Sequence, residues 1–189
     1  MESLLPDYIV RRGSTLDRAL LVKFMQRTYQ ELFPEQQDFS HLLQTVEQYF
    51  SSKTPVWWVF VRQRDKEDKE DKEDKEDKGA SSTMSTPSPM STSSSPQSPV
   101  ACIWVGNAID QIQGTRHSHI FLLYVVPEHR RQGIAKALML YVENWAKARG
   151  DRQIALQVFE SNAPAYNLYN QLGYQTQSLW MLKPLNSNE

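Results

Sequence analysis

Apolar residues recur along the chain with two different periods, which divide it into helices and strands. Spacings of three and four residues predict helices over residues 14–33, 40–50, 133–149 and 161–172, the N-caps being Ser14 or Thr15, Ser40 and Ser161. Runs of β-branched and aromatic residues predict strands over residues 8–10, 56–61, 100–109, 119–126, 154–159 and 174–182. The order β-α-α-β-β-β-α-β-α-β indicates an α/β fold with one mixed central sheet flanked by helices.

The strongest patterns lie in the C-terminal half. Residues 120–126 form an unbroken apolar run, which is typical of a central strand covered on both faces. The helix over residues 133–149 keeps its spacing to the end, where Gly150 follows. The five tryptophans fall at strand and helix spacing and are expected mostly in the core.

One break in composition interrupts these patterns. Residues 65–78 hold nine acidic residues against five lysines, and residues 79–99 consist almost wholly of Ser, Thr, Pro and Met. Neither part offers apolar surface to offset the entropy of ordering. We therefore expect residues 65–99 to be a disordered insertion in the hairpin between the second and third predicted strands, within one domain over residues 1–189.

Charge and cysteine content narrow the choice of partners. The net charge of the chain is −1, and it rises to about +3 on the folded part once the insertion is left out. This suits an anionic ligand but gives no reason to expect nucleic acid. No apolar run is long enough to span a membrane, and the N-terminus lacks the pattern of a secretion signal. Cys102 is the only cysteine. We expect a cytoplasmic protein without a membrane partner, and a homodimer is possible.

The junction at residues 125–135 carries the most specific chemistry. A buried strand ends there, and the predicted long helix opens at Gly133 beside Arg130 and Arg131. The first N–H groups of a helix lack intrahelical partners and carry the positive end of its dipole, so they can bind a phosphate or pyrophosphate. The alternative is a plain loop glycine with solvated arginines. A Rossmann fingerprint and a Walker loop are both absent.

Two motifs together resemble the GNAT superfamily of acyltransferases. Arg130-Arg131-Gln132-Gly133-Ile134-Ala135 matches the acetyl-CoA motif Arg/Gln-x-x-Gly-x-Gly/Ala. Downstream, Asn162 to Tyr174 is similar to the signature Asn-x-x-Ala-x-x-Leu-Tyr-x-x-x-Gly-Phe, with Tyr174 in place of Phe. The resemblance is close over residues 121–185 and implies a GNAT-like fold.

The resemblance also implies how acetyl-CoA is held, without a metal. Val125 would pair with the pantetheine arm, residues 131–136 would hold the pyrophosphate, and Asn162 would bond the arm unless it serves only as a helix cap. The implied cofactor-binding residues are Leu123, Tyr124, Val125, Arg130, Arg131, Gln132, Gly133, Ile134, Ala135, Lys136 and Asn162.

Tyr169 stands at the family's catalytic acid position, although its spacing also suits a core aromatic. The general base is left unassigned, because residues 120–126 contain no carboxylate; His117, His119 and Glu160 are candidates, with solvated or strand-edge roles as the alternative. Glu31, Glu35 and Asp38 cluster between the first two predicted helices and could attract a cationic amine, or simply be solvated.

The resemblance implies an N-acetyltransferase that moves an acetyl group from acetyl-CoA to a primary amine. The amine would belong to a protein N-terminus, a lysine or a small molecule. Two alternatives stay open at this point: another acyl-CoA as donor, and a non-catalytic module that binds acyl-CoA as a sensor or scaffold.

Overall fold

The computed structural model describes residues 2–63 and 97–185. Six strands form one sheet in the order β1-β2-β3-β4-β5-β6. They are β1 (Glu2–Leu5), β2 (Tyr8–Arg12), β3 (Val56–Val61), β4 (Ala101–Ile109), β5 (Arg116–Val125) and β6 (Ile154–Leu156). All neighbours pair antiparallel except β5 and β6, which are parallel. The predicted mixed sheet is confirmed.

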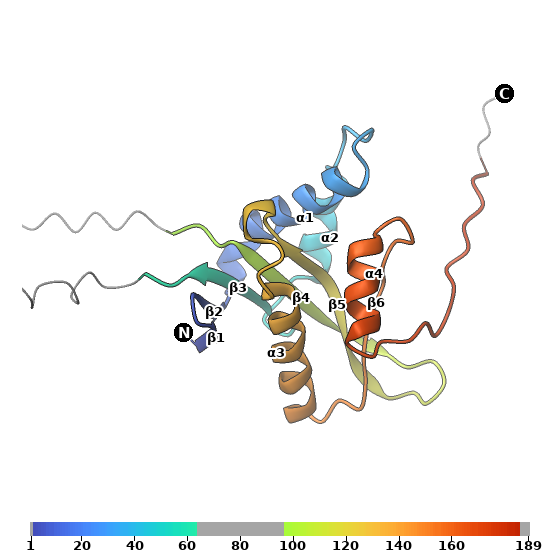
Figure 1. Cartoon of the computed structure of the whole chain (residues 1–189). Coiled ribbons are helices and arrows are strands. Elements are labelled where there is room, and N and C mark those ends of the chain that lie inside the picture. Colours follow the sequence, from blue (N-terminus) through green and yellow to red (C-terminus); the bar gives the residue numbers. More distant parts are fainter. Residues whose placement is uncertain (1, 64–96, 186–189) are drawn as a thin grey trace, which may run out of the picture.

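Helices cover both faces of this sheet (Figure 1). Helices α1 (Arg18–Leu32) and α2 (His41–Tyr49) pack on one face, and α3 (Ile134–Ala148) and α4 (Ala163–Gln171) pack on the other. Alternation along β3 divides the core, because Trp58 and Phe60 join the α1 side while Trp57 and Val59 join the α3 side. The central strands are therefore apolar at successive positions, as the sequence predicted.

Local capping fixes two of the helix starts. Ser14 accepts a hydrogen bond from Leu16 N at 3.2 Å, and Asp17 accepts one from Ser14 N at 2.8 Å, which together form a capping box ahead of α1. The prediction that Ser161 caps α4 is wrong, because Asn162 occupies the N-cap and accepts from Ala165 N at 3.3 Å. Ser40 precedes α2 without a side-chain cap bond.

The β5–β6 pair is joined firmly at one end. Asp151 precedes β6, and its side chain is only 1% exposed. It accepts hydrogen bonds from Ser118 on β5 (2.5 Å), from Arg149 after α3 (2.5 Å) and from Arg116 (3.2 Å). Burial alone would raise the pKa of Asp151, but these hydrogen bonds and the two guanidinium charges lower it below its ordinary value. The network lies where the ladder begins, at Ser118 opposite Ile154.

The hairpin around the predicted insertion is confirmed. Strands β3 and β4 pair directly, from Val56 opposite Trp104 to Val59 opposite Ala101. Of the predicted disordered residues 65–99, all but 97–99 lie outside the described residues. Gln97 donates a hydrogen bond to Val61 O at 2.7 Å, so the chain returns beside the strand that it left.

Both ends of the chain differ from the prediction. Strand β1, which was not predicted, forms a hairpin with β2. Pro6 and Asp7 form the turn between them, and proline is favoured at the second position of a β-turn. The predicted strand over residues 174–182 is wrong, because the described residues after Gly173 contain no regular element. Residues 179–182 are 78–89% exposed, so Trp180 lies outside the core. Without a neighbouring strand to pair with, an apolar run does not form a strand by itself.

The Asp151 network yields a test of stability. Asp151→Asn leaves Arg149 without its buried charge partner, so we expect the free energy of unfolding to fall by about 3 kcal/mol in urea titrations at pH 7. Because the folded pKa is lowered, the contribution of Asp151 is present above about pH 4 and is lost as pH falls through the folded pKa. The variant should therefore lose less stability than the parent between pH 5 and pH 3. Glu47→Gln, on the exposed side of α2, is the control; equal pH dependence in all three proteins would contradict this account.

Candidate active site

The site begins where β5 and β6 part. Their ladder ends at Ile120 opposite Leu156, whereas β5 continues to Val125 beside β4. Val126 N donates to Val100 O on the β4 side at 2.9 Å. Since backbone groups alternate in direction along an antiparallel strand, those of Leu123 and Val125 face the other side, where the pairing with β6 has ended. Two residues of the predicted set thus present backbone groups at an open strand edge, except for Val125 O, which accepts a hydrogen bond from Arg130.

A left-handed turn follows and opens α3. Arg131 has φ 63°, the only positive φ among the non-glycine residues that the structure describes, and Gly133 at the N-cap has φ 82°. Such conformations cost free energy and concentrate at functional sites. The first bond of the helix runs from Ala137 N to Gly133 O at 2.9 Å, so the N–H groups of the residues before Ala137 lack helical partners. The backbone of Ile134, Ala135 and Lys136 is therefore placed to bind an anion.

Space for a ligand lies in front of Gly133. A Cβ atom built there would meet no atom within 4 Å, so packing does not require glycine at this position. The left-handed backbone does require it, because side chains with a Cβ are disfavoured at this φ. The turn therefore offers N–H groups without helical partners, beside open space at Gly133.

Side chains on either side hold this turn in place. Tyr8 on β2 hydrogen-bonds through its hydroxyl to His129 Nδ1 at 2.9 Å and to Gln132 Oε1. Arg130 Nε donates to Val125 O at 2.9 Å. Gln132 and Arg130, both predicted to bind the cofactor, thus have structural contacts in this conformation.

A carboxylate reaches the same strand end from α1. Glu31 accepts hydrogen bonds from the Tyr124 hydroxyl at 2.7 Å and from Arg130 Nη2 at 2.6 Å. Burial, the hydrogen bond and the Glu31 charge raise the pKa of Tyr124 to about 12. Glu31 belonged to the predicted acidic cluster, and the structure places it next to the motif strand, which has no carboxylate of its own.

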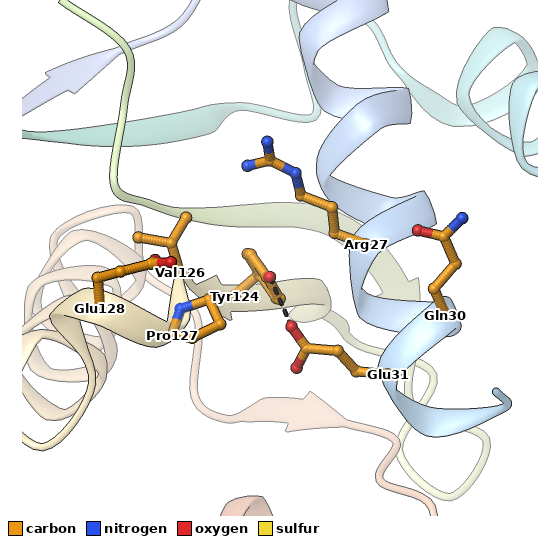
Figure 2. Close-up of a pocket in the computed structure, with 7 residues that line it drawn as sticks. All are labelled: Arg27, Gln30, Glu31, Tyr124, Val126, Pro127 and Glu128. Atoms are coloured by element: carbon orange, nitrogen blue, oxygen red, sulfur yellow. Dashed lines mark hydrogen bonds between the residues drawn. The ribbon is translucent and has the colours of Figure 1, made fainter.

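A pocket of about 370 Å³ lies between α1 and the end of β5. Figure 2 shows residues of α1 on one wall, the turn after β5 on the other, and Tyr124 between them. It is lined by Arg27, Gln30, Glu31, Tyr124, Val126, Pro127 and Glu128. Sequence reasoning missed Arg27, Gln30 and Glu128, since nothing in their spacing links α1 to a turn a hundred residues later.

Helix α4 brings the second motif to this side of the sheet. Tyr169 is buried in the core cluster that also contains Val125 and Ile134, and burial raises its pKa to about 12. No residue in the described part of the chain hydrogen-bonds to its hydroxyl. Asn162 caps the helix through its side-chain oxygen, as the structural alternative anticipated.

The candidate bases on β5 lie at the wrong end of the strand. His117 and His119 stand near its start, beside the β4–β5 hairpin, and a strand rises about 3.3 Å per residue. They are therefore roughly 20 Å or more from Val125. Glu160 lies on the exposed turn before α4, and the side chain of Asp38 accepts from Ser40 N. Among Glu31, Glu35, Asp38 and Glu160, Glu31 is the one that lines the pocket.

Comparison with known proteins shows to which family the chain belongs. The model of the Acetyltransferase (GNAT) family matches residues 65–174, more than half of the chain. The chain belongs to the GNAT acetyltransferase family. The predicted membership is thus confirmed, and with it acetyl-CoA as the cosubstrate that this fold uses.

Named relatives in the GNAT family are similar over limited stretches. Human N-acetyltransferase 8 is 30% identical over 88 residues, which cover 40% of this chain and 39% of that protein. Streptothricin acetyltransferase of Streptomyces lavendulae is 38% identical over 50 residues, 26% of each chain. The chain thus matches well under half of the length of these relatives.

Solved structures are similar over nearly the whole chain. A possible acetyltransferase of Clostridium difficile 630 superposes with a TM-score of 0.63 at 17% identity, covering 96% of this chain and 99% of the other. A predicted acetyltransferase of Clostridium acetobutylicum, solved with acetyl-CoA, has a TM-score of 0.59 at 16% identity and covers 94% and 96%. At these identities the likeness establishes the GNAT fold.

Gly133→Ala separates the ligand role of this turn from its structural role. The added Cβ meets no atom in the free protein, so unfolding should change by only about 1 kcal/mol from backbone strain. The Cβ would stand in the approach to the α3 amides, so we expect acetyl-CoA to bind at least about tenfold more weakly by calorimetry. Gly114→Ala, another left-handed glycine with open space but in the β4–β5 hairpin, is the matched control. Equal acetyl-CoA affinity in both variants would contradict a site at this turn.

Proposed function

We propose that this protein is an N-acetyltransferase that moves the acetyl group of acetyl-CoA to a primary amine. The observation that carries the proposal is the left-handed turn at Arg131 and Gly133, which leaves the first amides of α3 open beside the free edge of β5. The α3 amides and Lys136 would bind the pyrophosphate, and Leu123 and Val125 would hold the pantetheine arm.

The reaction is a direct attack on the thioester. The amine nitrogen forms a bond to the acetyl carbon, and the carbon–sulfur bond breaks. Starting from an ammonium, the acceptor loses two protons: one goes to the CoA thiolate and one to solvent. A backbone N–H near Val125 would stabilise the oxyanion of the tetrahedral intermediate.

Tyr169 would relay the proton that reaches the thiolate: its hydroxyl donates to the leaving sulfur and takes back the proton that the amine gives up. It is protonated at neutral pH, because burial raises its pKa to about 12, and its hydroxyl has no partner in the described part of the chain. The pocket beside Tyr124 would receive the acceptor, since it opens at the same end of β5.

Tyr169→Phe tests catalysis apart from binding. Removing the acid should lower kcat about 10²–10⁴-fold, measured as thiol release from acetyl-CoA over a panel of amines. Acetyl-CoA affinity measured by calorimetry should stay the same. Tyr166→Phe, an exposed tyrosine on the same helix, is the control. Tight acetyl-CoA binding without thiol release from any amine in the parent protein would favour a non-catalytic sensor or scaffold instead.

The pH dependence of kcat/KM follows from the same pKa. The rate should rise as the acceptor amine loses its proton and then stay level, because Tyr169 keeps its proton up to about pH 12. Steady-state rates between pH 6 and pH 10.5 check this. A falling limb near pH 10 that disappears in Tyr169→Phe would show that the pKa of Tyr169 is not raised.

A further inference from the structure

The charges around the pocket beside Tyr124 are arranged in a way that acetyl transfer alone does not require. Each wall bears an acidic side chain, Glu31 on α1 and Glu128 on the turn after β5, and α1 also bears Arg27. Glu31 is already engaged by Tyr124 and Arg130. The remaining two charges, Arg27 and Glu128, decide what the pocket can accept.

Arg27 is a cation without a carboxylate partner in the described part of the chain. Its guanidinium lies over the ring of Phe24, 5.6 Å from the ring centroid. Its charge is felt at the floor of the pocket, since it lowers the pKa of Tyr124 against the opposing effect of burial. In Figure 2 its side chain and that of Glu31 both extend from α1 toward the pocket, with Arg27 above Glu31.

Glu128 provides the opposite charge on the other wall. It follows Val125 closely in the chain, so it stands at the end of β5 where the thioester would lie. Its backbone oxygen accepts from Gln132, while its carboxylate has no ion-pair partner among the residues that the structure describes. Among the residues that the structure describes, the pocket therefore has an anion without an ion-pair partner on the turn after β5 and a cation without one on α1, on the opposite wall.

We infer that the acceptor is a free α-amino acid or a similar small amino carboxylate, whose carboxylate binds Arg27 and whose amine faces Glu128. A guanidinium matches a carboxylate with two parallel hydrogen bonds. The volume of about 370 Å³ suits a molecule of this size. A polycationic amine would meet repulsion from Arg27, and a protein N-terminus or lysine side chain has no free carboxylate beside its amine to pair with it.

This inference rests on the proposed acetyl transfer and names its acceptor. The products are an N-acetyl amino acid and CoA, with one proton released. The experiment uses the full chain and measures thiol release from acetyl-CoA with each of the standard amino acids and with the matching amino acid amides. The amides keep the α-amine and side chain but lack the carboxylate charge. We expect the best amino acid to exceed its amide at least about tenfold in kcat/KM.

Arg27→Gln should abolish that preference. KM for the amino acid should rise about 10–100-fold, while the amide is used as before and acetyl-CoA binds unchanged. Lys23→Gln, an exposed residue on the same helix, is the control. Arg27→Lys, which keeps the charge without the planar fork, should lie between the parent and Arg27→Gln.

The outcomes distinguish the two proposals. Transfer to amines in which amides are used as well as acids, or in which Arg27→Gln affects both equally, overturns the amino acid acceptor and leaves acetyl transfer standing. Should Arg27→Gln fail to fold, the ratio of acid to amide in the parent protein decides alone. A protein that neither binds acetyl-CoA nor releases thiol with any amine overturns the proposed function itself.

Discussion

The incomplete pairing of β5 with β6 is the constraint on which the rest of the structure depends. Asp151 ties the beginnings of both strands to the end of α3 through Ser118 and Arg149. Past Ile120 the ladder stops, so the end of β5 keeps a free edge. Strands β5 and β6 are held together only at the end where Asp151 lies. At the other end, the free edge of β5 therefore lies beside the first amides of α3.

The two sides of the sheet contribute different parts of the site. The α3 side supplies the left-handed turn and the buried Tyr169, whereas the α1 side supplies the charged pocket. Arg130 joins them, since it bonds both to Val125 O and to Glu31. The turn that would hold the cofactor is thereby in direct contact with the helix that would hold the acceptor, and the family motif contributes to both.

Local sequence determined what could be predicted. Runs of β-branched and aromatic residues predicted β3, β4 and β5, and the motif glycine marked the start of α3, because both signals act over a few residues. The pocket could not be derived in this way, because Arg27 and Glu128 line the same pocket only after α1 has packed on the sheet. The last strand failed for a related reason, since residues 174–182 have strand-like composition but no strand to pair with.

The short β6 also limits which substitutions this part of the sheet can accept. The backbone groups of Leu123 and Val125 give up ladder hydrogen bonds that a longer β6 would provide. Substitutions that extended the parallel ladder past Leu156 would make the fold more stable and would occupy the edge that a ligand needs. In this part of the sheet a gain in thermodynamic stability would therefore come at the expense of an edge that is open to a ligand.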